Sequence, residues 1–231
     1  MKVSQVPVNL SRRTALLTIG AVALGGCASQ PVSPAEPEKL VEDARTTLSN
    51  FIRDPDQTWI QDNLNRARAV LIAPQIVRAG FIIGGSGGRG LLVARDGRTW
   101  SGPAFYNLAT ASVGFQAGVD VSEAIIVVMT EKGLNSLLSS SFKMGADASI
   151  AAGPVGASAG STVTADLITF TRARGVFGGL NLNGTVVSTN VPWNDAFYGR
   201  SNVLPPDVLI RQTVVSPQAQ ALLADVARAA K

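Results

Sequence analysis

A helical pattern of apolar positions marks each end of this chain, and a strand-like pattern fills the middle. From Glu36 to Ile52 apolar residues recur every three or four positions with charged residues between them, which predicts an amphipathic helix. The same spacing predicts a second helix over 56–72, ahead of Pro74, and a last one over 217–230.

Residues 76–190 are rich in Gly, Val, Ile, Thr and Ser and break into short apolar runs separated by turn signals such as Asp96-Gly97. A short helix is expected over 131–140, and short helices or turns over 193–199 and 205–212. The expected strands are 77–84, 90–95, 103–108, 111–118, 123–129, 144–152, 155–161, 165–173, 176–181 and 184–189. The predicted fold class is therefore α+β: an antiparallel, glycine-rich, barrel-like or sandwich β domain with N-terminal and C-terminal amphipathic helices packed on it.

The first residues have the layout of an export signal. Lys2, Arg12 and Arg13 precede an apolar stretch over 15–24, which is shorter than the roughly 20 residues of a membrane span. The paired arginines favour the twin-arginine export route, and the general secretory route stays open.

Cys27 is the only cysteine of the chain and follows this apolar stretch. The run Leu24-Gly25-Gly26-Cys27 resembles a lipobox, in which a peptidase cuts between Gly26 and Cys27 and the thiol carries diacylglycerol. The alternative is an ordinary secretory signal with a chance cysteine. We expect a signal peptide over 1–26, a lipidated proline-rich tether over 27–37 and a single domain over 38–231. The expected location is lipid-anchored and periplasm-facing, and Ala28 favours the outer membrane.

The charge of the chain gives no reason to expect a nucleic-acid partner. The 231 residues include 20 basic and 16 acidic ones, a net charge of +4. Three of the basic residues and none of the acidic ones precede Cys27, so the remainder carries a net charge of only +1. Any anion site must therefore be a local cluster.

Two glycine-rich motifs suggest chemistry that the rest of the chain does not support. Residues 84–88 match the G-x-S-x-G motif of serine hydrolases, but the chain has no histidine to accept the proton of Ser86. Residues 85–90 match G-x-G-x-x-G, but a strand-like run follows where a dinucleotide site needs a helix. We expect a glycine-rich hairpin, no enzyme activity, and no metal or cofactor. Asp120 and Glu123 are expected in a solvated turn.

An ordered series of short motifs connects most of the chain to a known family. It comprises Ala79-Gly80-Phe81, Gly88-Arg89-Gly90, Trp100-Ser101-Gly102-Pro103-Ala104-Phe105, Gly114-Phe115-Gln116-Ala117-Gly118, Gly153-Pro154-Val155-Gly156, Gly175-Val176-Phe177-Gly178-Gly179 and Phe197-Tyr198-Gly199. In this order over 74–199, the motifs resemble the SYLF-domain family of lipid-binding proteins. The resemblance implies binding of phospholipid head groups. The actin binding of some eukaryotic members is not transferred to an exported protein.

Arginines supply the candidate contacts to a head group. Arg78, Arg89, Arg95 and Arg98 have only Asp96 among them, and a hairpin would bring several of them to one edge. Arg172 and Arg174 are two apart on an expected strand and thus share a face. The alternative is that these are ordinary solvated or ion-paired surface charges. The helix over 36–52 has four acids and two bases, so we expect it to pack on the β domain rather than on a bilayer.

Two functional hypotheses follow. The first is a membrane-anchored periplasmic lipoprotein that binds phospholipids, with anionic head groups favoured, and performs no catalysis. Its partners are a phospholipid membrane and the diacylglycerol on Cys27. The second is an envelope structural or protein-interaction lipoprotein whose only lipid contact is its acyl anchor.

Overall fold

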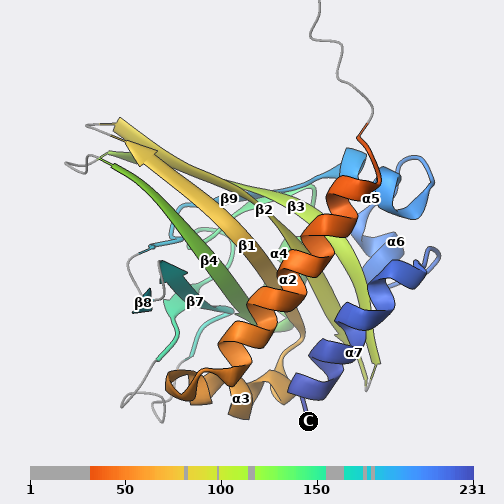
Figure 1. Ribbon diagram of the computed structural model, residues 1–231, viewed down its shortest axis with the longest axis horizontal. Coiled ribbons are helices and arrows are strands. Elements are labelled where there is room, and N and C mark those ends of the chain that lie inside the picture. Colours follow the sequence, from red (N-terminus) through yellow and green to blue (C-terminus); the bar gives the residue numbers. More distant parts are fainter. Residues whose placement is uncertain are drawn as a thin grey trace, which may run out of the picture. The chain divides into compact units, whose positions relative to one another are not determined.

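The computed structural model describes residues 32–80, 83–97, 99–113, 118–154, 164–173, 176–177 and 180–231 (Figure 1). Its helices are α2 (Ala35–Arg53), α3 (Thr58–Asn63), α4 (Glu131–Leu138), α5 (Val191–Tyr198), α6 (Pro205–Leu209) and α7 (Gln220–Ala229). Short 3-10 turns, η1 (Pro55–Gln57), η2 (Leu64–Arg66) and η4 (Pro217–Ala219), lead into or out of these helices. Within the described residues, no helix is both long and apolar enough to span a bilayer.

One large sheet forms the centre of residues 32–231. Its strands are β1 (Ala69–Gly80), β2 (Ile83–Asp96), β3 (Thr99–Val113), β4 (Gly118–Val128), β5 (Ser141–Lys143), β6 (Ile150–Ala152), β7 (Leu167–Ala173), β8 (Val176–Phe177) and β9 (Val186–Thr189). They lie in the order β5-β9-β3-β2-β1-β4-β7-β6, with β8 also paired to β7. All pairs are antiparallel except β6 with β7.

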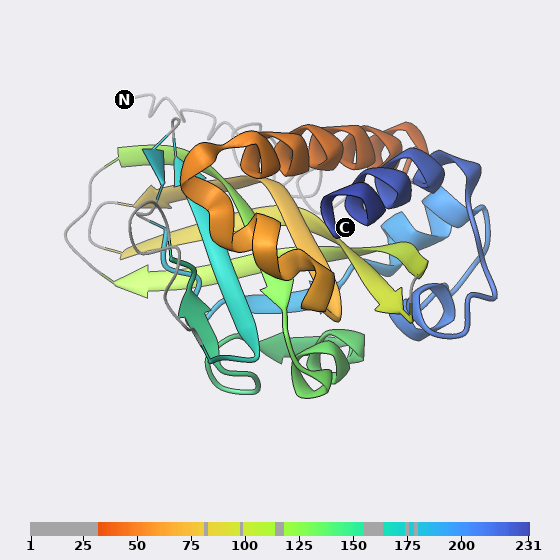
Figure 2. The same ribbon diagram turned by 90° about the horizontal axis from the view of Figure 1, so that it is seen from below.

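The sheet curls so that its two edge strands come near each other. β5 and β6 are joined by a short turn, in which Met144 and Ala148 form an isolated bridge. The curl and the flanking helices confirm the predicted α+β fold class with a barrel-like antiparallel sheet (Figures 1 and 2).

Each face of the sheet has its own hydrophobic core. The face that we call the α2 face is covered by α2, α3, α5 and α7, and buries residues such as Phe51, Val70 and Phe105. The opposite α4 face is covered by α4, α6 and β5, and buries Leu71 and Tyr106 among others. Because successive strand residues point to opposite faces, β1 and its neighbours contribute alternately to both cores.

The helices at the two ends confirm the sequence pattern. α2 spans the expected amphipathic segment and buries Leu40, Val41, Ala44, Leu48 and Phe51. It begins at Ala35, three residues ahead of the expected domain start. α4 and α7 match the helices expected over 131–140 and 217–230.

The helix predicted over 56–72 is wrong in its second half. Helical structure ends at Arg66, and Ala69 begins β1. Residues 69–73 are all buried, because the central strand is covered on both faces. A continuous apolar run has no period that separates a buried strand from a buried helix.

Other strand boundaries also differ from those predicted. Strands were predicted over 103–108 and 111–118; residues 103–113 belong to the single long strand β3, which ends at Val113, and 114–117 lie outside the described residues. Asp120 and Glu123, expected in a solvated turn, lie within β4. The strand expected over 155–161 lies outside the described residues.

Asp166 joins the start of α4 to the sheet. Its carboxylate accepts hydrogen bonds from Thr130 Oγ1 at 2.6 Å and from the backbone N–H and hydroxyl of Ser149 at 2.9 and 2.7 Å. Thr130 also caps α4 by accepting from the backbone N–H of Gly133. The hydrogen bond from Thr130, followed by those from Ser149, lowers the pKa of Asp166 from 3.8 to about 2.

We predict that Asp166→Asn destabilises the protein more at neutral pH than in acid. A lowered pKa means that ionised Asp166 stabilises the fold above pH 3.8, and that this stability is lost as the pH falls toward 2. The expected loss for Asp166→Asn at pH 7 is about 1–2 kcal/mol, allowing for solvent screening. Urea unfolding at pH 7 and pH 2.5 measures it. The exposed Asp62→Asn is the control, and an equal loss for Asp166→Asn at both pH values contradicts the prediction.

Candidate functional site

The expected hairpin around the candidate arginines is confirmed, because β1 and β2 pair from Ala69–Ala94 to Gly80–Gly84. It separates the arginines rather than gathering them. Arg78 lies on the α4 face and opposes Asp120 of β4, with Arg78 Nη2 3.5 Å from Asp120 Oδ2. Arg89 lies on the α2 face and opposes Gln75 and Asn107 of the neighbouring strands.

Arg95 is six residues from Arg89 along β2, a separation of about 20 Å. Its guanidinium donates to the backbone carbonyls of Asn65 and Gly97, the latter at 2.9 Å, and lies 6.0 Å from the ring centre of Trp100. Arg95 therefore binds backbone groups at the end of β2 that is distant from Arg89, and the two arginines do not form one site.

Arg172 of β7 forms an ion pair with Glu123 of β4, in which Arg172 Nε donates to Glu123 Oε1 at 2.6 Å. Glu123 Oε2 accepts from the Thr47 hydroxyl of α2 at 2.9 Å. The side chains of Arg172 and Glu123 are only 17% and 18% exposed. This arrangement fixes α2 to the sheet. The other predicted site residues, Gly26, Cys27, Arg98 and Arg174, lie outside the described residues.

Arg89 differs from the other described candidates in what its guanidinium contacts. It is exposed and stacks over the ring of Trp193, with its Cζ 4.6 Å from the ring centre. Within the described part of the chain, no carboxylate or carbonyl accepts a hydrogen bond from it. A guanidinium on an aromatic face keeps its N–H donors free for a ligand.

Polar side chains hold the Trp193 ring in place. Trp193 is in the first turn of α5, whose N-cap Asn190 accepts from the Trp193 backbone N–H at 3.3 Å. Asn190 also donates to the Asn107 side chain of β3 at 3.0 Å, and Asn194 accepts from the backbone N–H of Phe105 at 2.8 Å. The Phe105 ring packs edge-on against Trp193. These contacts fix the position of the Trp193 ring on which the Arg89 guanidinium stacks.

Arg89 and Trp193 border a pocket of about 580 Å³ between the first half of α2 and strands β1–β3. Its polar lining comes from Gln75 and Asn107 on the strands and from charged residues of α2. Lys39 Nζ lies 2.6 Å from Asp43 Oδ2, so these two charges largely cancel. Glu36, at the start of α2, adds a further acid. The pocket is mixed in charge, with Arg89 as its cation on the sheet side.

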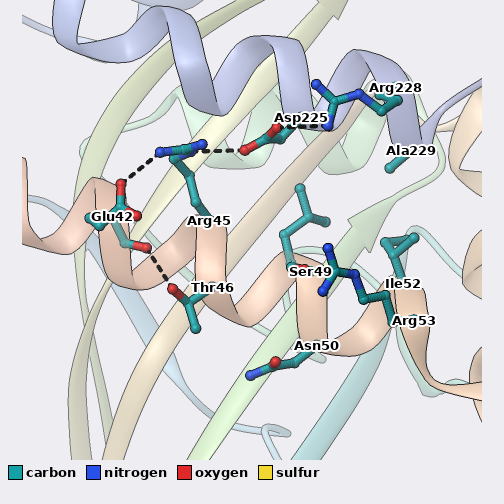
Figure 3. A pocket seen from close by; sticks show the side chains of 11 residues that line it. Glu42, Arg45, Thr46, Ser49, Asn50, Ile52, Arg53, Asp225, Arg228 and Ala229 are labelled. Atoms are coloured by element: carbon teal, nitrogen blue, oxygen red, sulfur yellow. Dashed lines mark hydrogen bonds and ion pairs between the residues drawn. The ribbon is translucent and has the colours of Figure 1, made fainter.

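A second pocket, of about 650 Å³, lies between α2 and α7 (Figure 3). The two helices run side by side in the same direction in Figures 1 and 2. Arg45 bridges them, with contacts of 2.7 Å to Glu42 and 2.8 Å to Asp225, and the hydrogen bond to Asp225 is the main reason for its raised pKa. Arg228 also contacts Asp225, at 3.1 Å.

This second pocket is less suited to an anion than the first. The arginines at its centre already share the two carboxylates. The pocket also extends to the C-terminal ends of α2 and α7, where the helix dipoles are negative. Arg53 and Arg228 lie at these ends, and their positive charges interact favourably with the helix dipoles, which gives both residues a structural role.

Ser86 does not lie in the local structure that a serine hydrolase needs for its nucleophile. Residues 84–88 lie within β2, and Ser86 opposes Arg78 and Thr110 on the neighbouring strands. A nucleophile elbow needs a sharp turn from strand to helix. The expected hairpin pairing is confirmed, but the glycine-rich residues 85–89, expected between strands 77–84 and 90–95, lie within β2.

Sequence reasoning missed the part that Trp193 plays beside Arg89. The two residues are more than 100 positions apart, and no local pattern joins them. Asn190, directly ahead of Val191-Pro192, was a usable signal for the start of α5, because Asn is a preferred N-cap and Pro suits the first turn. It did not reveal which strand α5 packs on.

Comparison with known proteins connects this fold to a family. A family model named Ysc84, described as "Las17-binding protein actin regulator", matches residues 109–230. Protein YSC84 of Saccharomyces cerevisiae is 29% identical over 195 residues, covering 78% of this chain and 41% of that protein. SH3 domain-containing YSC84-like protein 1 is 27% identical in Xenopus laevis, covering 77% of this chain and 54% of that protein. The human protein of that name is also 27% identical, with coverages of 73% and 50%.

The chain thus spans about half the length of the relatives it matches. The matched segment includes β4, α5, α7 and the last five residues of β3, whereas Arg89, Phe105 and Asn107 precede it. The family model covers more than half of the chain, and the relatives add the β1–β2 region that carries the glycine motifs. This chain belongs to the Ysc84 family, the SYLF-domain family that its motifs indicated.

Proposed function

We propose that this domain binds phospholipid membranes by contacting head groups at the pocket of Arg89, without catalysis. In this proposal a diacylglycerol on Cys27 anchors the protein to the periplasmic side of the outer membrane. The observation that carries the proposal is the exposed Arg89 guanidinium, held on Trp193 with no acceptor among the described residues.

The surroundings of Arg89 suit a lipid phosphate. A guanidinium binds phosphate oxygens through two parallel hydrogen bonds. Gln75 and Asn107 flank Arg89 on the neighbouring strands, and their side-chain amides supply further donors. Trp193 is only 7% exposed, and its ring supports the Arg89 guanidinium rather than contacting lipid itself.

The charge balance of the pocket sets the expected strength of binding. Glu36 and Asp43 face the same pocket as Arg89, so its potential is not strongly positive. A single guanidinium then discriminates between lipids only modestly. The acyl anchor supplies most of the membrane affinity, as it does for lipidated proteins in general when a second, weaker contact is present.

We predict that Arg89→Glu weakens binding to anionic vesicles about tenfold, because one charge-assisted phosphate contact is replaced by repulsion. The measurement is co-flotation of residues 27–231, without the expected signal peptide, with vesicles of phosphatidylcholine and phosphatidylglycerol. Cys27→Ser is included in every variant so that no acyl group contributes. Arg95→Glu should bind as the parent does, since Arg95 faces backbone carbonyls at the far end of β2.

Arg66→Glu makes the same change in net charge at an exposed position of η2 and should leave binding unchanged. If Arg89→Glu and Arg66→Glu weakened vesicle binding equally, the loss would come from the change in net charge and not from a contact made by Arg89. Equal binding of the parent to neutral and anionic vesicles would argue against head-group recognition.

A second candidate is a protein-interaction role in the cell envelope. The description of the family model, which names a Las17-binding actin regulator, favours a protein partner for the relatives. Cross-linking in cells that captures one dominant protein, with no vesicle binding by the purified chain, would select this alternative.

A further inference from the structure

The α2 face of the sheet continues past the pocket as an exposed apolar surface. A row of directly paired residues crosses five strands there: Val186 of β9, Ala109 of β3, Gly87 of β2, Val77 of β1 and Val121 of β4. All five are exposed, and the side chains of Val77 and Val121 are 39% and 45% exposed. This row is the first half of what we call the strand-tip surface.

A second row lies further from α2. It contains Ala111, Gly85, Ala79 and Val119, again paired strand to strand. Val119 is 63% exposed, among the highest values for a large apolar residue in the described part of the chain. In Figure 1 these ends of β1–β4 extend to the upper left beyond α2. The strand-tip surface is thus built only from Val, Ala and Gly.

Charge is absent from this end of the hairpins in the sequence. Residues 79–88 and 108–119 contain no Asp, Glu, Lys or Arg. Contiguous exposed apolar patches of a few hundred Å² on a soluble protein are often functional contact surfaces. A long uncharged stretch in two neighbouring hairpins therefore indicates a surface that is covered in function.

A polar row separates the strand-tip surface from the covered core. Ser188, Asn107, Arg89 and Gln75 are paired across β9, β3, β2 and β1, one step nearer to α2. Arg89 stacks on Trp193 at this boundary. The order from the strand tips inward is apolar, then the polar row with Arg89, then the buried core, which includes Trp193 at 7% exposed. An arginine beside an apolar surface matches the level of lipid head groups beside acyl chains.

The size of the surface argues against a second copy of the chain as its cover. One row across five strands and one across four, with strands about 4.8 Å apart, give an area of about 300 Å². A stable dimer buries about 800 Å² on each partner. A bilayer needs no minimum complementary area, and its interface accepts small apolar side chains beside a cationic rim.

We propose that the strand-tip surface docks against the acyl-chain boundary of the bilayer, while Arg89 reaches the phosphates above it. This inference rests on the proposed function and gives it a docking orientation. The ends of β1–β4 then face the membrane, and the loop between α6 and η4 stays in water.

The single cysteine of the chain allows a direct test. In a Cys27→Ser background, Val119→Cys and Val215→Cys each provide one site for an environment-sensitive nitrobenzoxadiazole label. Val215 is 77% exposed and lies in the loop between α6 and η4. With residues 27–231 and phosphatidylcholine–phosphatidylglycerol vesicles, the label at 119 should shift to the blue and brighten. It should be quenched by nitroxide lipids, and the label at 215 should not change.

Introducing a charge into the strand-tip surface tests whether this surface contributes to vesicle binding. Val119→Asp should lower the vesicle-bound fraction severalfold, whereas Val215→Asp should not, and circular dichroism checks that both fold. If the parent floats with vesicles while the label at 119 stays in water, the docking orientation is overturned and the proposed function stands. If the parent does not float, the proposed function fails as well. A blue shift at 119 without vesicles that grows with protein concentration identifies a second copy and overturns the inference.

Discussion

Gly88→Ala is expected to lower the free energy of unfolding by about 3 kcal/mol, one of the two largest effects predicted for this protein. A Cβ at Gly88 would lie 2.4 Å from the backbone O of Gln75 and 3.1 Å from the Cα of Ile76. Both atoms belong to the backbone of β1, where the register shifts between Ile72 and Gln75. The irregular strand approaches β2 so closely that only glycine fits.

The neighbouring glycine is the matched control. A Cβ at Gly87 would meet no atom nearer than Leu108 O at 3.8 Å, which is an ordinary contact. Gly87→Ala is therefore expected to change stability by less than about 1 kcal/mol. Urea unfolding of both variants, followed by circular dichroism, tests the pair. Equal stabilities would show that the close approach of β1 to β2 at Gly88 is not maintained in solution.

Glu123→Ala is expected to cost about 3 kcal/mol, because it leaves the largely buried Arg172 without its carboxylate. It also removes the acceptor for the hydroxyl of Thr47, a residue that is 3% exposed, and so loosens α2 from β4. Glu123→Gln keeps an oxygen for Thr47 and should cost less. Thermal unfolding of the two variants and the parent measures the difference.

An exposed ion pair serves as the comparison for Glu123. Lys39 and Asp43 are 74% and 43% exposed, and Asp43→Ala should change stability by less than about 1 kcal/mol. The same experiments separate two roles of Arg172. If Arg172→Ala loses stability but, once folded, binds vesicles as the parent does, Arg172 is structural. A loss of vesicle binding with unchanged stability would restore it as a head-group contact.

Local patterns in the sequence were sufficient for the elements that have one polar and one apolar side. α2, α4 and α7 lie at a boundary between core and solvent, so their charged residues mark the helical period. The first half of β1 is covered on both faces, and its five consecutive buried residues carry no such mark. That is why the helix predicted over 56–72 ran on into the strand.

The sequence predicted arginines as the residues of the candidate site, but it did not predict which of them lie together. The sequence placed Arg78, Arg89 and Arg95 within 18 positions, but strand alternation and strand length put them on different faces or at different ends. The residues that each arginine contacts come from distant positions in the sequence, such as Glu123 for Arg172 and Trp193 for Arg89. Such pairings depend on strand order, which one sequence does not encode locally.

The start of α2 beside the Arg89 pocket has a consequence for how a lipid anchor would act. Ala35, the first residue of α2, is eight positions after Cys27, and a fully extended segment of that length reaches about 28 Å. With the proposed diacylglycerol on Cys27, a tether this short would keep the domain in a thin layer of water above the lipids. In that layer the local concentration of head groups around Arg89 would be in the millimolar range or higher. A contact too weak to recruit a free protein would then be enough to set which side of the anchored domain faces the membrane.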